Sequence, residues 1–223
     1  MPLVPMSIFV DFALANGTPR VTLVTNWKRE EHDNHDFYRG LKSAIVGMHT
    51  KSETVDSLRS FVESQNDARR KRIYPELLGH YGECMKRLHL MVSSGGAPPR
   101  LNKRMPLAGS FWGAHKVGVS VDPQVSFVAG DLTYLVKLYL RSEAPTKKRV
   151  DLTLELMRVA YEATGQPILS RPPPRRYALL DVRRRKLHVA EAGRATPLAN
   201  ALWTLLHGEL AAFNAIYWSN QLR

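Results

Sequence analysis

With 223 residues, 44% of them hydrophobic and 23% charged, the chain is long enough to bury a core and has the composition of a globular rather than a disordered protein. Cys84 is its single cysteine, which excludes an intramolecular disulfide and favours a buried structural thiol. No stretch approaches the ~18 consecutive apolar residues of a membrane span, and residues 1–6 lack the basic start of a signal peptide, so we expect a soluble, cytoplasmic protein.

The net charge of +12 is concentrated in two windows of the sequence. Residues 69–104 contain nine Lys or Arg against two acidic residues, and residues 141–194 contain thirteen against six, whereas the rest of the chain sums to −2. Two basic blocks on a foldable chain indicate a polyanionic partner, and nucleic acid is the partner that we expect.

The N-terminal half is predicted to contain a β-hairpin followed by helices. Residues 7–14 and 21–25 are rich in β-branched and aromatic residues and flank the turn signal Asn16-Gly17, which predicts a hairpin over 7–25. Apolar residues at spacings of three and four predict three helices, over 36–49, 53–71 and 75–91. Residues 93–99 are rich in Ser, Gly and Pro and predict a linker or a long loop.

The second half is predicted to form a small sheet with two helices. Alternating apolar residues and short turns predict an antiparallel meander of three strands, over 116–121, 124–129 and 133–140. Thr146 and Thr196-Pro197 are start signals for helices that end near residues 164 and 220. Between these helices, a strand over 177–182 is predicted to pair with 187–190 across an Arg-rich turn.

These elements predict an α+β fold, with a small, mostly antiparallel sheet packed by helices and an additional helical stretch in the N-terminal half. One division of the chain places the hairpin and helical region in residues 1–92, a linker in 93–105 and an α+β region in 106–223. A single domain with one core, whose sheet the N-terminal hairpin joins, fits the sequence equally well.

The run Arg183-Arg184-Arg185-Lys186 is the strongest candidate for phosphate contacts. It falls at a predicted hairpin turn, which favours Gly, Asn or Asp, and four like charges there repel each other and gain nothing from packing. Arginine suits phosphate because its planar guanidinium donates hydrogen bonds in pairs. Further cations join this patch if their helix and connector lie beside the turn: Arg171, Arg175, Arg176, Lys147, Lys148 and Arg149.

Two other polar tracts have simpler explanations. The run Arg69-Arg70-Lys71-Arg72 is predicted at the end of a helix, where the helix dipole favours cations, so a solvated helix end explains it equally well. Residues 30–36 contain two histidines and several carboxylates, and His49 is a candidate third metal ligand. Since the tract lacks the spacing of established zinc motifs, we expect a hydrophilic loop with a helix cap at Asp33 or Asn34, and no metal site.

The order of helix 75–91, strands within 116–140, helix 147–164 and strand 177–182 resembles the core of the PD-(D/E)xK nuclease family. The resemblance implies a metal-binding acid at a strand end, matched by Asp131, and a lysine on the next strand, matched by Lys137. It also implies cleavage that depends on Mg²⁺ or Mn²⁺ and is abolished by Asp131→Ala; otherwise no cofactor is expected. Leu135 stands where the family has its second metal carboxylate, which implies a degraded active site.

The leading hypothesis is therefore a non-enzymatic protein that binds nucleic acid non-specifically through phosphate contacts. A divergent, nuclease-like enzyme using Asp131 and Lys137 is one alternative. A second alternative is a protein-interaction module whose basic faces meet an acidic protein partner, with the long C-terminal helix as a face for self-association.

Overall fold

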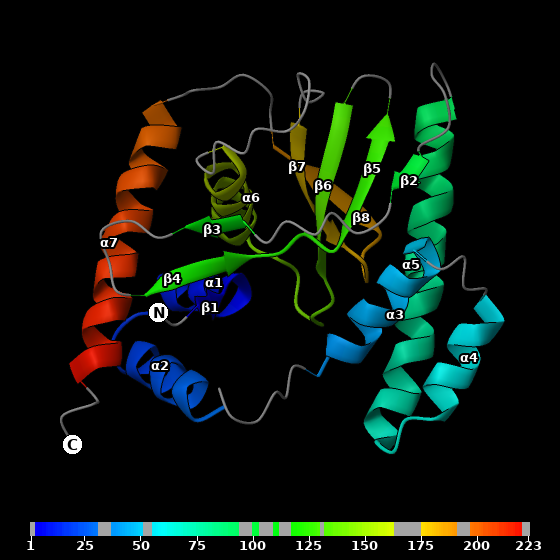
Figure 1. The fold of residues 1–223 in the computed structure, drawn as a ribbon, viewed down its shortest axis with the longest axis horizontal. Helices are drawn as coiled ribbons and strands as arrows, with labels where there is room; N and C mark the ends of the chain where they lie inside the picture. Colours follow the sequence, from blue (N-terminus) through cyan, green and yellow to red (C-terminus); the bar gives the residue numbers. More distant parts are fainter. Residues whose placement is uncertain are drawn as a thin grey trace.

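The computed structural model describes residues 3–30, 37–50, 55–93, 100–102, 109–111, 117–129, 132–162, 175–190 and 197–219. A mixed β-sheet lies between two groups of helices, which gives the α+β architecture predicted from the sequence (Figure 1). The predicted linker 93–99 lies outside the described residues except for Ser93, and the division into two domains remains a prediction.

The central sheet has five strands in the order β2-β5-β6-β7-β8. Its members are β2 (Arg100–Asn102), β5 (Val125–Ala129), β6 (Leu132–Tyr139), β7 (Arg175–Asp181) and β8 (Lys186–Val189). Within the described residues, β6 and β7 form a parallel pair and the other three neighbouring pairs are antiparallel, as predicted for most of the sheet. Helix α6 (Lys147–Glu162) is the crossover that the parallel pair requires.

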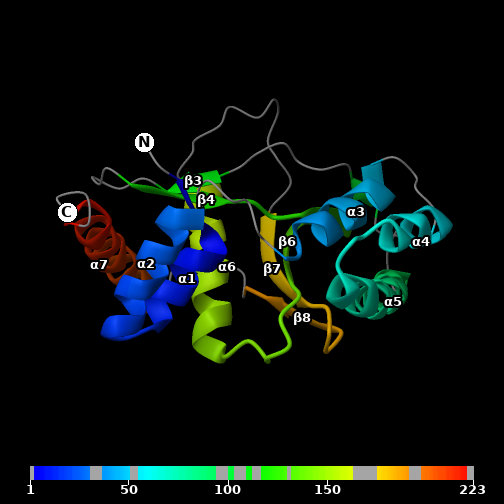
Figure 2. The same cartoon turned by 90° about the horizontal axis from the view of Figure 1, so that it is seen from below.

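The two faces of this sheet belong to two different hydrophobic cores. Leu135 and Tyr139 of β6 pack with α6 on one face. Val136 and Leu138 pack on the other face with helices α3 (Arg39–Thr50), α4 (Val55–Glu63) and α5 (Ala68–Ser93). This alternation follows from the period of two along a strand. Figure 2 shows β6 and β7 between α6 and α5.

The predicted meander is wrong in its first strand. β4 (Gly118–Val121) belongs to a separate three-stranded sheet, where it lies between β1 (Leu3–Pro5), which is parallel to it, and β3 (Gly109–Phe111), which is antiparallel. Val117, Val119 and Val121 are fully buried in the core that contains α6 and the N-terminal helix α1 (Met6–Leu14). The Asp-Pro pair after β4 separates the two sheets, because proline has no N–H for a strand ladder.

The predicted N-terminal hairpin is also wrong, because residues 7–25 form helices. α1 (Met6–Leu14) and α2 (Thr18–Glu30) are joined at Gly17, whose φ of 59° is accessible to glycine, so the predicted turn exists but connects helices. The buried residues of α1 recur on a helical period: Met6, Phe9, Val10, Phe12 and Ala13. Helix α1 packs on β4, α2, α6 and α7, and this tertiary packing overrides the β-propensity of its residues.

Three helices cover the second face of the sheet: α3 (Arg39–Thr50), α4 (Val55–Glu63) and α5 (Ala68–Ser93). The helix predicted over 53–71 ends at Glu63, and the next one begins well before residue 75. The boundary is set by Asp67, whose Oδ1 accepts hydrogen bonds from the backbone N–H groups of Arg69 (2.7 Å) and Arg70 (3.2 Å). This is the standard side-chain cap of a helix start.

The C-terminal helix α7 (Pro197–Ser219) confirms the prediction of a long helix there. Its buried side packs on α1, α2 and α6. Phe213 is fully buried and meets Phe12 and Trp27 edge to face, with ring centroids 5.0 and 5.6 Å apart. Within the described residues, none of the helices has the length and apolar run needed to cross a bilayer.

Candidate functional site

The arginines of the β7–β8 turn bind carboxylates on α5. Arg183 Nη1 lies 3.0 Å from Glu76 Oε1, and Arg185 Nε lies 2.8 Å from Glu83 Oε2. Glu76 and Glu83 are seven residues apart, about two helical turns, so they share one face of α5. The prediction that Arg183–Lys186 gains nothing from packing is therefore wrong, because these ion pairs dock the turn on α5.

The same turn also forms hydrogen bonds with the segment that follows β6. Arg183 Nε donates to the carbonyl of Leu140 (3.3 Å), and Arg184 Nη2 donates to the carbonyl of Ser142 (2.9 Å). Asp181 is fully buried, and its Oδ1 accepts from the backbone N–H of Arg184 (3.2 Å). Arg185 takes the left-handed conformation, with φ of 55°, which is uncommon for a residue other than Gly or Asn.

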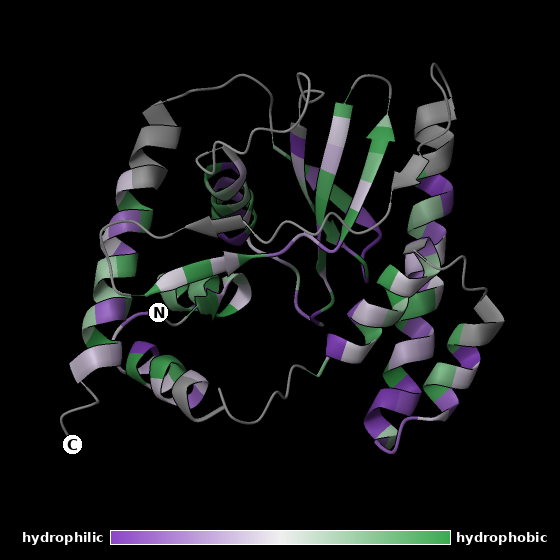
Figure 3. Cartoon of the chain, viewed as in Figure 1, coloured by the Kyte–Doolittle hydropathy of each residue, from purple (hydrophilic) through white to green (hydrophobic). Residues whose placement is uncertain are grey.

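The two basic windows of the sequence meet at this contact. Arg72 lies one turn before Glu76 on α5, and Lys86 and Arg87 lie about one turn after Glu83; all three are exposed. We call these residues, together with the turn, the basic seam: Arg72, Lys86, Arg87, Arg183, Arg184, Arg185 and Lys186. Figure 3 shows hydrophilic residues both at the start of α5 and at the β7–β8 turn. Seven cations here face three carboxylates, so the seam has a positive excess.

The other predicted phosphate contacts are spread over the molecule. Arg175 and Arg176 are at the start of β7, about 20 Å along the seven-residue strand from the turn, and Arg176 Nη1 donates to the carbonyl of Ala190 (3.4 Å). Lys147 and Lys148 are exposed in the first turn of α6, at the end of the sheet where the β7–β8 turn lies. Arg171 lies outside the described residues.

The run Arg69–Arg72 occupies the first turn of α5, not the end of a helix as predicted. The helix dipole is unfavourable for cations at that position. The guanidinium groups of Arg69 and Arg70 instead lie over the ring of Phe37, 5.1 and 5.5 Å from its centroid. These cation–π contacts, rather than the helix dipole, stabilise the two arginines at this position.

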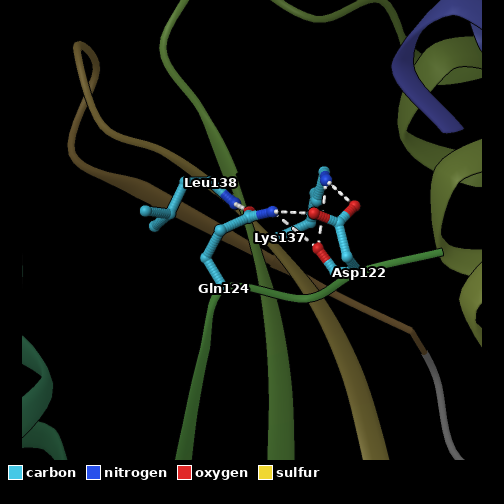
Figure 4. Close-up of polar contacts among 4 residues, drawn as sticks. All are labelled: Asp122, Gln124, Lys137 and Leu138. Carbon is cyan, nitrogen blue, oxygen red and sulfur yellow. Dashed lines mark hydrogen bonds and ion pairs between the residues drawn. The ribbon is translucent and has the colours of Figure 1, made fainter. Parts of the chain in front are cut away.

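Lys137 is buried on β6, where it is bound to Asp122 (Figure 4). Its Nζ lies 2.8 Å from Asp122 Oδ1 and donates to the Asp122 carbonyl at 3.0 Å. Gln124 donates through Nε2 to that carbonyl (2.6 Å) and accepts at Oε1 from the backbone N–H of Leu138 (2.9 Å). Asp131, which the nuclease resemblance paired with Lys137, lies outside the described residues.

A cavity of about 100 Å³ lies beside Lys137, between the start of α1, α3, β6 and α6. Cationic side chains from four separate segments line it: Lys42, Lys137, Arg141 and Arg149. Of these four residues, Lys42 and Arg141 were not singled out from the sequence. Lys42 and Arg141 do not belong to a run of consecutive basic residues, so such runs in the sequence do not reveal the group.

Apart from Glu30, the histidine-rich tract over 30–36 lies outside the described residues. The described part of the chain contains no group of three His, Cys, Asp or Glu that could hold a metal ion. The Nε2 atom of His49 lies 2.6 Å from the Tyr81 hydroxyl. Burial lowers the pKa of His49 and raises that of Tyr81, so burial favours the neutral form of both groups, and the histidine tautomer sets which of them donates.

Cys84 is buried on α5, 2% exposed, as predicted for a structural thiol. Burial is the main cause that raises its pKa to about 11, and it outweighs the cations Arg185 and Arg87, which act in the opposite direction. A thiol with this pKa is protonated at neutral pH and is a weak nucleophile.

Comparison of the chain with models of protein families, with curated proteins and with solved structures finds no match.

Proposed function

We propose that this protein binds nucleic acid through phosphate contacts of the basic seam, as a non-enzymatic protein of the cytoplasm. The observation that carries the proposal is the meeting of the two basic windows, in which cations of α5 lie beside the docked turn Arg183–Lys186. A row of cations on rigid elements suits a phosphate backbone, whose charges repeat at short and regular intervals.

The ion pairs of the seam support this function by orienting the arginines. Glu76 and Glu83 are about half exposed, and each takes one edge of a guanidinium group. An arginine has five N–H donors, so the donors that neither a carboxylate nor a backbone carbonyl takes are available to a phosphate. The exposed Lys86, Arg87 and Lys186 add charge that these pairs do not neutralise.

The test is fluorescence anisotropy with labelled duplex DNA, single-stranded DNA and RNA, titrated over a range of salt. Arg87→Gln with Lys186→Gln removes two seam cations and should lower the salt slope on duplex DNA by roughly 1.8, at about 0.9 per contact. Arg59→Gln with Arg158→Gln removes the same charge from α4 and α6 and should leave the slope nearer to that of the wild type.

Two results would overturn the proposal. One is no binding to any of the three nucleic acids at low salt, which would favour the acidic protein partner instead. The other is equal weakening by the seam variant and by its control, since only total charge would then matter.

A second candidate function, metal-dependent cleavage, is favoured by the contact between Lys137 and Asp122 beside the β5–β6 pair. Among the described residues, Asp122 is an acid that binds this lysine. Cleavage of nucleic acid in Mg²⁺ or Mn²⁺ that disappears in Asp122→Ala, or in Asp131→Ala, would support it. Absence of cleavage with both metals would exclude this function, and cleavage that survives Lys137→Ala would exclude Lys137 from its site.

A further inference from the structure

The turn between α1 and α2 exposes an asparagine that directly precedes a glycine. Ala15, Asn16 and Gly17 separate the two helices, and the side chain of Asn16 and the backbone of Gly17 are both exposed. Gly17 has a φ of 59°, and a Cβ added at this position would meet nothing within 4 Å. Because glycine has no Cβ, the Asn16 side chain can approach the Gly17 nitrogen without steric hindrance.

The hydrogen bonds of this turn do not involve the groups that such an approach brings together. The Gly17 carbonyl accepts from the backbone N–H of Arg20 at 3.0 Å, and the Ala15 carbonyl accepts from Arg20 Nε at 2.8 Å. Within the described part of the chain, no group binds the Gly17 N–H or the Asn16 amide. The amide carbon of Asn16 and the backbone nitrogen of Gly17 are therefore both available to react.

We propose that Asn16 is a modification site, at which spontaneous deamidation through a cyclic imide produces aspartate and isoaspartate. The Gly17 N–H gives its proton to hydroxide, and its nitrogen forms a bond to Asn16 Cγ. The Cγ–Nδ2 bond breaks, and the departing nitrogen takes a proton from water and leaves as ammonia.

Water then opens the imide in one of two directions. Breaking the bond between the Gly17 nitrogen and Asn16 Cγ leaves aspartate in an ordinary main chain. Breaking the bond between that nitrogen and the Asn16 main-chain carbonyl carbon leaves isoaspartate, whose main chain runs through Cβ and Cγ. No atom is oxidised or reduced, and solvent water is the only co-reactant.

The two products should differ in their effect on the turn. Either one places a negative charge just before the first turn of α2, which contains no acidic residue and where the helix dipole favours an anion. Isoaspartate also lengthens the main chain between Ala15 and Gly17, which Arg20 spans with its two hydrogen bonds. Isoaspartate should therefore loosen the junction of α1 and α2, whereas aspartate should not.

The same helix contains a matched control at Asn26. This asparagine is also exposed, but it lies inside α2 and precedes Trp27. In the interior of a helix the backbone N–H donates to the carbonyl four residues earlier, and the bulky side chain of Trp27 hinders an approach to its nitrogen. Exposure alone therefore predicts equal reaction at the two asparagines, whereas the turn geometry predicts reaction at Asn16.

The test is incubation of the native, full-length protein at mildly alkaline pH, followed by trypsin digestion and mass spectrometry. Residues 1–20 contain Asn16 as their only amide side chain and end at their only basic residue, and residues 21–28 contain Asn26 as their only amide side chain. The peptide 1–20 should acquire the mass of an amide-to-acid exchange more than about tenfold faster than the peptide 21–28, which corresponds to a modest difference in activation free energy. A digest made before incubation gives the baseline.

Isoaspartate is detected in the same peptide with a protein-isoaspartate methyltransferase and labelled S-adenosylmethionine. Asn16→Gln keeps an amide but lengthens the side chain, which disfavours ring closure, so the variant should lose both the mass change and the label. Asn16→Asp reproduces the aspartate product and should unfold in urea as the wild type does. An aged fraction enriched in isoaspartate, separated by ion exchange, should have a lower urea midpoint.

Three results would overturn the assignment of this site. They are an unchanged peptide 1–20, equal rates at Asn16 and Asn26, and isoaspartate label that persists in Asn16→Gln. A rate at Asn16 that is more than about tenfold slower in the native protein than in denaturant would also overturn it, because the fold would then shield the turn. The turn shares no residue with the basic seam, so the outcome is independent of the nucleic-acid proposal.

Discussion

Arg141 binds Asp11 through both terminal nitrogens of its guanidinium group, although the two residues are 130 positions apart in the sequence. Asp11 lies in the middle of α1, and Arg141 follows the end of β6. Arg149 of α6 joins the same carboxylate at 2.6 Å. One side chain of α1 therefore ties the N-terminal helix to both the central sheet and its crossover helix.

Removal of the Asp11 charge should destabilise the fold. Asp11→Asn leaves two partly buried arginines without their shared carboxylate, so we expect the free energy of unfolding to fall by about 1–3 kcal/mol. Urea denaturation measures this loss, with Asp151→Asn on α6 as the control. Equal stability of Asp11→Asn and the wild type would show that this carboxylate does not tie α1 to the rest of the fold.

Neutralising the acidic face of α5 should strengthen nucleic-acid binding. Glu76→Gln with Glu83→Gln removes the charges that bind Arg183 and Arg185, so the seam becomes more positive. We expect tighter binding with a steeper salt dependence, and a loss of stability below about 1 kcal/mol per pair because these pairs are exposed. Glu63→Gln on α4 is a single-charge control. Unchanged or weaker binding in the double variant, measured by anisotropy, would count against the seam.

The docking of α7 should depend on one aromatic side chain. Phe213→Ala leaves a cavity between Phe12 and Trp27, where Phe213 is fully buried, and should lower the free energy of unfolding by about 3–5 kcal/mol. Ile216→Ala, at a partly buried position of the same helix, should cost clearly less. Urea denaturation with far-UV circular dichroism compares the two variants. Equal losses would mean that α7 does not dock through Phe213.

Elements with strong local signals were predictable from the sequence. Thr146 accepts a hydrogen bond from the N–H of Arg149 (3.2 Å), as the cap signal for α6 implies. The β7–β8 hairpin and α7 also occur where the turn and the Thr-Pro start signal place them. In these segments the local preference agrees with the tertiary packing, and the prediction is confirmed.

The elements that failed depend on distant contacts. The β-branched and aromatic residues of 7–14 favour a strand locally, but packing of Phe9 and Phe12 against Phe213 stabilises a helix. The candidate sites show the same limit. The sequence identified Arg183–Lys186 as candidate phosphate contacts. It did not reveal their pairing with Glu76 and Glu83, because that pairing requires α5 to lie beside the turn. The four cations of the cavity come from separate segments, so only the folded chain brings them together.

Cys84 should be inert in the native protein. Its thiol is buried, and burial raises its pKa to about 11, so the reactive thiolate is scarce at pH 8. We expect slow modification by iodoacetamide under native conditions and rapid modification in denaturant, followed by mass spectrometry. Cys84→Ala should remove the signal in both conditions. Rapid native labelling would show that this part of α5 opens readily.

Stability should fall as the solution is acidified through the range in which histidine titrates. Burial lowers the pKa of His49 and of His188 in the folded state, and Lys186 adds to the effect at His188. The unfolded chain therefore binds more protons than the folded chain near pH 6. The contribution of the neutral histidines to stability is complete above about pH 6.5, and it is lost as the pH falls through their folded-state pKa. His49→Gln retains a side chain that can hydrogen-bond to the Tyr81 hydroxyl in either direction, and it should reduce this slope. Urea midpoints measured between about pH 5.5 and 7.5, above the main range of carboxylate titration, test the effect. An unchanged slope of stability against pH in His49→Gln would mean that folding does not lower the pKa of His49. The variant His188→Gln, measured in parallel, gives the part of the slope that is due to His188.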